Sequence, residues 1–113
     1  MALDLLTYDQ VAQHRENSTS AVSVYSPSIN TTVQAFVKIA NVSDETVLCS
    51  VFHDNNGTTY NESTALVFEM PIMPGQILEI DHIFFSDETG NLAVQSSVAN
   101  AIVATVYGII RSA

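Results

Sequence analysis

Apolar and polar residues alternate along much of this chain with the period of a β-strand. The clearest stretch is 32–41, where every second residue is apolar and these residues would share one face of a strand. That face carries Val33, Ala35, Val37 and Ile39. Successive side chains of a strand point to opposite faces of the sheet, so the pattern predicts a strand with this face buried. The stretch 76–85 alternates in the same way and predicts a second long strand.

Eight strands are expected, separated by turn residues at a spacing of roughly ten residues. They cover 20–25, 32–41, 46–54, 58–60, 64–70, 76–85, 92–96 and 101–110. Ser43-Asp44-Glu45 is predicted to be a tight turn that joins two of these strands, 32–41 and 46–54, in a hairpin. Another turn is predicted at Met73-Pro74-Gly75. Pro71 is expected to end the strand before it, because proline cannot donate a hydrogen bond to a sheet.

A series of short strands without a strong helical pattern is typical of an all-β sandwich or barrel. We therefore expect residues 19–113 to form one antiparallel β-sandwich, jelly-roll-like rather than immunoglobulin-like. Periodicity does not specify strand order, so another Greek-key sandwich stays open. Residues 1–18 lack strand-like alternation and carry only a thin apolar stripe at helical spacing. They are predicted to be an N-terminal arm, either a short helix or a segment that orders on a partner.

Charge excludes two classes of partner. The chain has 12 acidic residues against 3 basic ones, and its formal net charge is -9 at pH 7. Binding to nucleic acid or to an anionic membrane needs clustered Lys and Arg, which this sequence does not offer. No apolar run approaches the roughly 20 residues of a membrane-spanning helix, and the first residues do not resemble a signal peptide. We expect a protein that folds in a cytoplasm, with its single cysteine, Cys49, as a buried inert thiol.

No motif of catalysis or cofactor binding is present. His14, His53 and His82 lack the spacing of metal ligands. The turns 43–45 and 86–88 each bring only two carboxylates, fewer than a calcium site needs. A nucleophile elbow and a phosphate-binding loop are both missing, and no pair of acidic residues is selected for hydrolysis. We expect no enzyme activity, no cofactor and no metal.

The order of several segments carries a resemblance. A strand ending in Val24-Tyr25-Ser26-Pro27 precedes the alternating strand 33–41, and the strand 47–52 follows. The turn at 73–75 then introduces Leu78-Glu79-Ile80, and an apolar strand at 103–108 ends the series. Over residues 19–110 this order resembles a recurrent family of small virion structural proteins of tailed bacteriophages.

The resemblance implies a non-enzymatic capsid decoration, or cement, protein that stabilises the head shell. Its partners would be the major capsid protein and copies of itself, as a homotrimer, on the capsid surface of virions assembled in the host cytoplasm. A tail, neck or head-fibre component is an alternative within the virion. A carbohydrate-binding sandwich is an alternative outside it, disfavoured because the chain has no Trp.

Apolar side chains on both faces of the predicted strands indicate a surface shared between subunits, because one small domain cannot easily bury two apolar faces. The expected partner contacts are arm residues and exposed aromatic residues. They are Leu3, Leu5, Leu6, Tyr8, Phe36 and Phe84.

Overall fold

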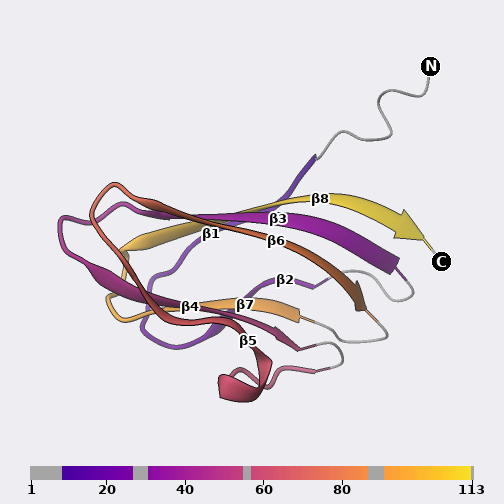
Figure 1. The fold of residues 1–113 in the computed structure, drawn as a ribbon, viewed down its shortest axis with the longest axis horizontal. Helices are drawn as coiled ribbons and strands as arrows, with labels where there is room; N and C mark the ends of the chain where they lie inside the picture. Colours follow the sequence, from indigo (N-terminus) through magenta and orange to yellow (C-terminus); the bar gives the residue numbers. More distant parts are fainter. Residues whose placement is uncertain (1–8, 27–30, 55–56, 87–90, 113) are drawn as a thin grey trace.

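The computed structural model describes residues 9–26, 31–54, 57–86 and 91–112, and these residues form an all-β fold. Eight strands make two antiparallel four-stranded sheets, seen as an upper and a lower layer in Figure 1. The strands are β1 (Asp9–Arg15), β2 (Val22–Tyr25), β3 (Thr31–Asn41), β4 (Val47–Asp54), β5 (Ala65–Ile72), β6 (Ile77–Ser86), β7 (Asn91–Ser96) and β8 (Ile102–Ser112). The all-β class predicted from alternation is confirmed.

Pairing between strands is almost entirely long-range. One sheet has the order β1-β8-β3-β6, and the other has the order β2-β7-β4-β5. The chain therefore passes from one sheet to the other at every connection except the one between β4 and β5. The pairs β1/β8, β2/β7, β3/β6 and β4/β5 are nested around that connection, as in one long hairpin folded over on itself.

The core lies between the two layers and comes from alternate residues of both. The four apolar residues that the pattern of β3 assigned to one face are at most 1% exposed, which confirms that prediction. From the opposite sheet, Val47, Cys49 and Val51 on β4 are completely buried and belong to the same cluster. Fully burying a Val- or Ile-sized side chain stabilises the fold by about 1.5–3 kcal/mol, so this two-sided cluster is a main source of stability.

The hairpin expected between 32–41 and 46–54 is wrong. β3 pairs with β6 and β8, whereas β4 pairs with β5 and β7, so the two strands lie in different sheets. The turn at 43–45 is a bridge between layers. Alternation shows which face of a strand is buried, but it does not show which strand is its partner. Two successive strands have the same alternation whether they pair in a hairpin or face one core from opposite sheets.

The buried amide of Asn41 holds this bridge in place. Its Nδ2 donates to the carbonyl oxygens of Glu45 and Ile72, both at 2.8 Å. Its Oδ1 accepts from the backbone N and the Oγ of Ser43, at 2.9 and 2.7 Å. One side chain, 2% exposed, thus ties the end of β3 to the bridge and to the end of β5.

The turn between β5 and β6 forms as predicted. The backbone N of Gln76 donates to the carbonyl of Met73 at 3.0 Å, and Gly75 has a φ of 78°. Proline at the second position and glycine with positive φ at the third are typical of a type II turn. Pro71, in contrast, does not end its strand, because it lies within β5 opposite Leu48. β5 is an edge strand, so one side of its backbone needs no partner there.

The short strand expected at 58–60 is wrong. These residues are not in a strand, and the 3-10 helix η2 (Glu62–Thr64) follows them, capped by the side chain of Asn61. Tyr60 packs against Phe52, with ring centroids 6.1 Å apart. The segment therefore contacts a large side chain of β4 that is itself only 1% exposed.

Seven of the 18 residues of the predicted arm are part of the sheet. Residues 9–15 form β1 and pair with β8, with a register shift between Gln10 and Ala12. The helix considered for this region is therefore absent from its described part. Pairing with a well-formed strand supplies the order that the weak alternation of β1 does not predict. Residues 1–8, with Leu3, Leu5, Leu6 and Tyr8, lie outside the described residues.

Candidate interaction surface

One side of the molecule exposes a group of large hydrophobic side chains, here called the β5 surface. Within the described residues, every exposed large hydrophobic side chain falls between positions 42 and 77. The members are Val42, Leu48, Leu66, Phe68, Met70, Met73 and Ile77. Three of them project from β5 itself, and the others belong to the neighbouring strand β4, the bridge after β3, the turn before β6 and the first residue of β6.

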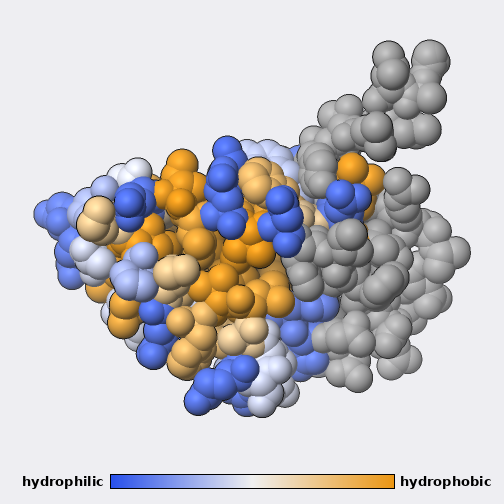
Figure 2. All heavy atoms as spheres, viewed as in Figure 1, coloured by the Kyte–Doolittle hydropathy of each residue, from blue (hydrophilic) through white to orange (hydrophobic). Residues whose placement is uncertain are grey.

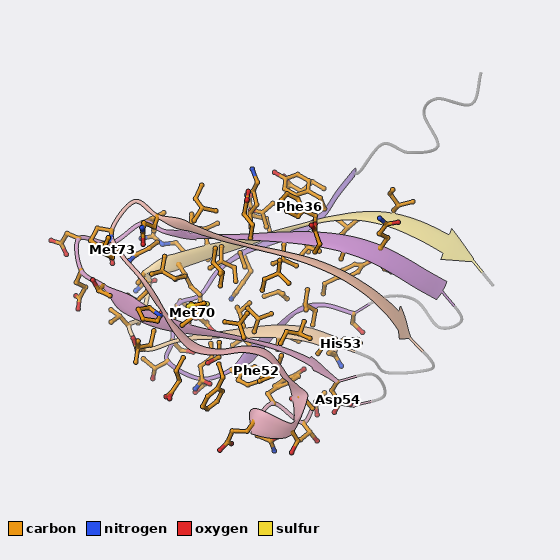
Figure 3. The ribbon with its side chains drawn as sticks, in the orientation of Figure 1. Phe36, Phe52, His53, Asp54, Met70 and Met73 are labelled. Atoms are coloured by element: carbon orange, nitrogen blue, oxygen red, sulfur yellow. The ribbon has the colours of Figure 1, made fainter. Side chains whose placement is uncertain are left out.

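Most of these residues lie on neighbouring segments, whereas Ile77 pairs with Ala40 and projects from the outer face of the other sheet. Met70 pairs with Cys49 across the β4–β5 ladder, and Leu48 pairs with Pro71. Backbone hydrogen bonds from Asn41 to Gln76 and from Gly75 to Asn41 bring the region of Val42 beside the β5–β6 turn. Hydrophobic atoms gather over the gap between the layers on the side where β5 and β6 run (Figures 1 and 2). Figure 3 shows Met70 near this gap and Met73 at the end of the molecule where β5 turns into β6.

The position of β5 explains this exposure. β5 and β6 are each an edge strand of their sheet, so their side chains that point away from the core are exposed to solvent. Met70 is on the ladder opposite a buried cysteine, yet it is 45% exposed. Contiguous exposed apolar groups on a folded domain typically mark a protein-binding surface. The β5 surface is therefore the strongest candidate for function within the described part of the chain.

A shallow pocket of about 130 Å³ opens within this surface. Leu48 and Ser50 of β4, Phe68 and Glu69 of β5, and Gln95 of β7 line it, together with Thr19 before β2. It therefore lies on the outer face of one sheet and spans three adjacent strands. The phenyl ring of Phe68 belongs both to the pocket and to the β5 surface.

Glu69, on the wall of this pocket, has a strained backbone. Its φ is 50°, in the left-handed region that non-glycine residues rarely adopt. The ladder between β4 and β5 shifts register here, and the backbone N of Glu69 donates to Ser50 Oγ at 2.8 Å instead of to a strand partner. A bulge of this kind redirects the side chain that it carries.

The charge around the β5 surface is mostly negative, and Lys38 beside Glu79 is the cation near it among the described residues. No Lys or Arg occurs between positions 39 and 110 of the sequence. Exposed carboxylates, in contrast, occur beside the surface at Asp44 and Glu45 in the bridge, at Glu69 on β5 and at Glu79 on β6. The Nζ of Lys38 is 3.9 Å from Glu79 Oε2, a contact between two exposed groups that contributes at most about 1 kcal/mol. The surface thus combines apolar side chains with negative charge.

Of the two aromatic contacts predicted from the sequence, Phe36 is not part of this surface. Phe36 lies half-buried on the opposite sheet, where its ring is 6.5 Å from that of Tyr107 and 5.9 Å from Lys38 Nζ. Phe84 is on β6 opposite Val33, and its side chain lies outside the described part of the structure. No observation tests either residue as a partner contact.

Sequence reasoning missed Leu66, Phe68 and Met70 as a group. A signal for them was present, because the run from Leu66 to Phe68 is apolar on both faces of a strand and is followed by Pro71. Proline within a strand is confined to edges and bulges, so the combination indicates an edge strand with an apolar outer face.

Among the remaining chemically active groups, one histidine lies close to a buried carboxylate. His14 Nε2 is 3.6 Å from Glu16 Oε1, and Glu16 is completely buried. Over the described ranges, no three His, Cys, Asp or Glu side chains are grouped so as to hold a metal ion. The acidic pair at 87–88 lies outside those ranges. No helix formed by the described residues is long and apolar enough to cross a membrane.

Cys49 provides a test of the core. Burial raises the pKa of its thiol to about 12 from an ordinary value of 9.0. We expect native protein at pH 8 to react with a thiolate-directed reagent about a thousandfold more slowly than urea-unfolded protein, because the thiolate fraction falls tenfold for each unit of pKa. Because the folded pKa is the higher one, this residue's contribution to stability is complete below pH 9 and is lost as pH rises from 9 toward 12. Rapid native labelling at pH 8 would contradict the burial of β4.

No protein-family model matches the sequence, and no curated protein matches it either.

Proposed function

We propose that this chain is a non-enzymatic structural protein of a tailed-phage virion, most specifically a capsid decoration protein that binds the shell through the β5 surface. The observation that carries the proposal is the grouped exposure of apolar side chains along an edge strand of a well-packed domain. A free monomer gains nothing from exposing them, whereas a subunit of an assembly buries them. The assignment to a phage virion rests on the resemblance of residues 19–110 to small virion proteins.

We further propose that the two sheets form a jelly roll. The orders β1-β8-β3-β6 and β2-β7-β4-β5, nested around β4–β5, support this. Jelly rolls are eight-stranded double-sheet folds that recur in viral capsid and lectin domains. Such a scaffold presents loops and edges to neighbours while its core remains closed.

The proposed partners are the major capsid protein and further copies of this chain, arranged as a trimer on the capsid surface. Closed symmetry allows several weak contacts to act together, so a small domain can attach firmly to a repeating shell. The arm residues Leu3, Leu5, Leu6 and Tyr8 remain proposed contacts. Phe36 and Phe84 remain proposed contacts between copies of this chain, not with the shell. Sizing with light scattering tests the trimer, and a monodisperse monomer at micromolar concentration would contradict it.

A carbohydrate-binding role is the less favoured alternative. The pocket beside Phe68 has the aromatic ring that sugar sites use, but its volume of about 130 Å³ is well below the roughly 300 Å³ at which small-molecule sites begin. The exposed apolar residues also extend far beyond the pocket, which a sugar site does not require.

The copy number of this chain in purified virions tests the proposal directly. We expect quantitative mass spectrometry to give a ratio of one copy, or a simple fraction of one, for each major capsid subunit. Binding to a repeating shell lattice produces such a ratio. A few copies per particle would indicate a tail, neck or fibre component, and absence from virions would overturn the structural role.

A further inference from the structure

We propose that the pocket between β4, β5 and β7 is a socket for one arginine side chain of a protein partner, held by the carboxylate of Glu69 and the ring of Phe68. The inference rests on the proposed function in one respect, namely that the β5 surface binds a protein. It adds the chemistry of the residue at the centre of the contact.

Size favours a single side chain. The pocket has a volume of about 130 Å³, which is too small to enclose a drug-sized molecule or a nucleotide. One long side chain of a docked protein fills such a depression without leaving a void. Central pockets that receive one anchor residue are typical of protein interfaces, and arginine is among the residues enriched there.

The hydrogen-bonding groups of the pocket favour a donor. Several of its polar atoms are already engaged within the chain. Ser50 Oγ accepts from the backbone N of Glu69, Ser97 Oγ accepts from that of Leu48, and Gln95 Nε2 donates to the carbonyl of Thr19. Glu69 is the one charged residue among those that line the pocket, and its carboxylate can only accept hydrogen bonds. An anionic ligand would meet this carboxylate without a cation beside it.

Apolar groups beside this carboxylate select arginine over a simple ammonium. Leu48 and Phe68 line the same pocket and are both exposed, with Phe68 at 48%. A guanidinium is planar, binds a carboxylate through two parallel hydrogen bonds and stacks on an aromatic ring, while its aliphatic stem covers apolar surface. No Lys or Arg lines the pocket, and Arg15 and Lys38 contact Asn100 and Glu79 instead, so a partner would supply this charge. The acidic surroundings of the β5 surface also disfavour a second copy placed face to face on it.

The strain at Glu69 supports a role for its side chain. A residue with a φ of 50° is accommodated most easily as glycine, yet this position carries a long charged group on the pocket wall. Strained backbone in folded proteins is concentrated at functional sites. The hydrogen bond from its backbone N to Ser50 fixes the conformation that the bulge requires.

The experiment is an NMR titration of the ¹⁵N-labelled chain with N-acetyl-arginine methylamide, compared with N-acetyl-citrulline methylamide, which has nearly the same shape and no charge. We expect the arginine compound to shift the amide signals of Phe68, Glu69 and Gln95, with a dissociation constant in the millimolar range, and the citrulline compound to bind at least tenfold more weakly. Glu69→Gln should abolish the difference between the two compounds. Glu62→Gln removes an exposed carboxylate from η2, outside the pocket, and should preserve it.

Glu69→Gly separates binding from folding. Glycine adopts the positive φ without strain, so this variant should melt at or above the temperature of the unchanged protein while losing arginine binding. Equal shifts from arginine and citrulline, or unchanged binding in Glu69→Gln, would overturn the socket. Shifts produced by glucose or galactose but not by arginine would assign the pocket to carbohydrate instead. Because the virion copy number is measured independently, failure of the socket is distinguishable from failure of the structural role.

Discussion

Replacing Asn41 by aspartate is expected to lower the free energy of unfolding by about 4 kcal/mol, a large part of the roughly 5–15 kcal/mol that stabilises a domain. The amide donates to the carbonyl oxygens of Glu45 and Ile72, and a carboxylate has no proton for either of them. The change leaves two carbonyls without this donor and places a negative charge against them in a site that is 2% exposed. Each unsatisfied buried group costs about 1–3 kcal/mol, and an unpaired buried charge costs more. Urea unfolding followed by far-ultraviolet circular dichroism measures the loss.

Asn61→Asp is the matched control for this substitution. Asn61 is exposed, and its side chain acts as an acceptor from the backbone N of Ser63 at the start of η2. Aspartate performs the same capping role, so its effect should stay within about 0.5 kcal/mol. Similar losses for both variants would show that Asn41 does not connect β3, the bridge and β5 as described.

Replacing Phe68 by serine is expected to weaken attachment to the shell about 100-fold, or by about 3 kcal/mol. Phe68 lies at the junction of the β5 surface and the pocket, where an aromatic side chain loses its solvent on binding. Its exposure in the free chain means that the substitution has little effect on folding. Binding of the purified variant to shells assembled without this chain measures the effect, with circular dichroism as a check on the fold.

Phe36→Ser is the comparison that identifies the contact face. Phe36 is on the opposite sheet beside Tyr107, and the sequence alone predicted it as a partner contact. If attachment depends on the β5 surface, the variant should bind shells within about threefold of the unchanged protein, since surface substitutions outside a contact have small effects. If Phe36→Ser lost binding and Phe68→Ser bound normally, the contact would lie on the face of β3 and the proposed surface would be wrong.

Alternation predicted most strands but not their partners. β3, β4, β6, β7 and β8 lie within a few residues of their expected ranges. The period of two is visible in β3 and β6, whereas β7 is buried on both faces and was located by the turn residues before it. β1 escaped prediction because edge pairing with β8 orders it despite weak alternation. The expected strand at 58–60 failed because a short β-like run there packs over Phe52 without joining a ladder.

The sequence by itself determined the all-β class, the buried face of β3 and the turn at Gly75, because side-chain period and backbone preference are local properties. It also determined the formal net charge of -9 and the absence of clustered Lys and Arg. Only the tertiary structure decided that β5 and β6 are edge strands on one side of the fold. For this reason the apolar side chains of Phe68 and Met70 are exposed and not buried. The tertiary structure alone brought Glu69 beside Gln95, 26 positions away in the sequence, in one pocket. The physical reason is that strand order depends on pairings between segments far apart in the chain, and the solvent exposure of an alternating strand follows from its place in that order.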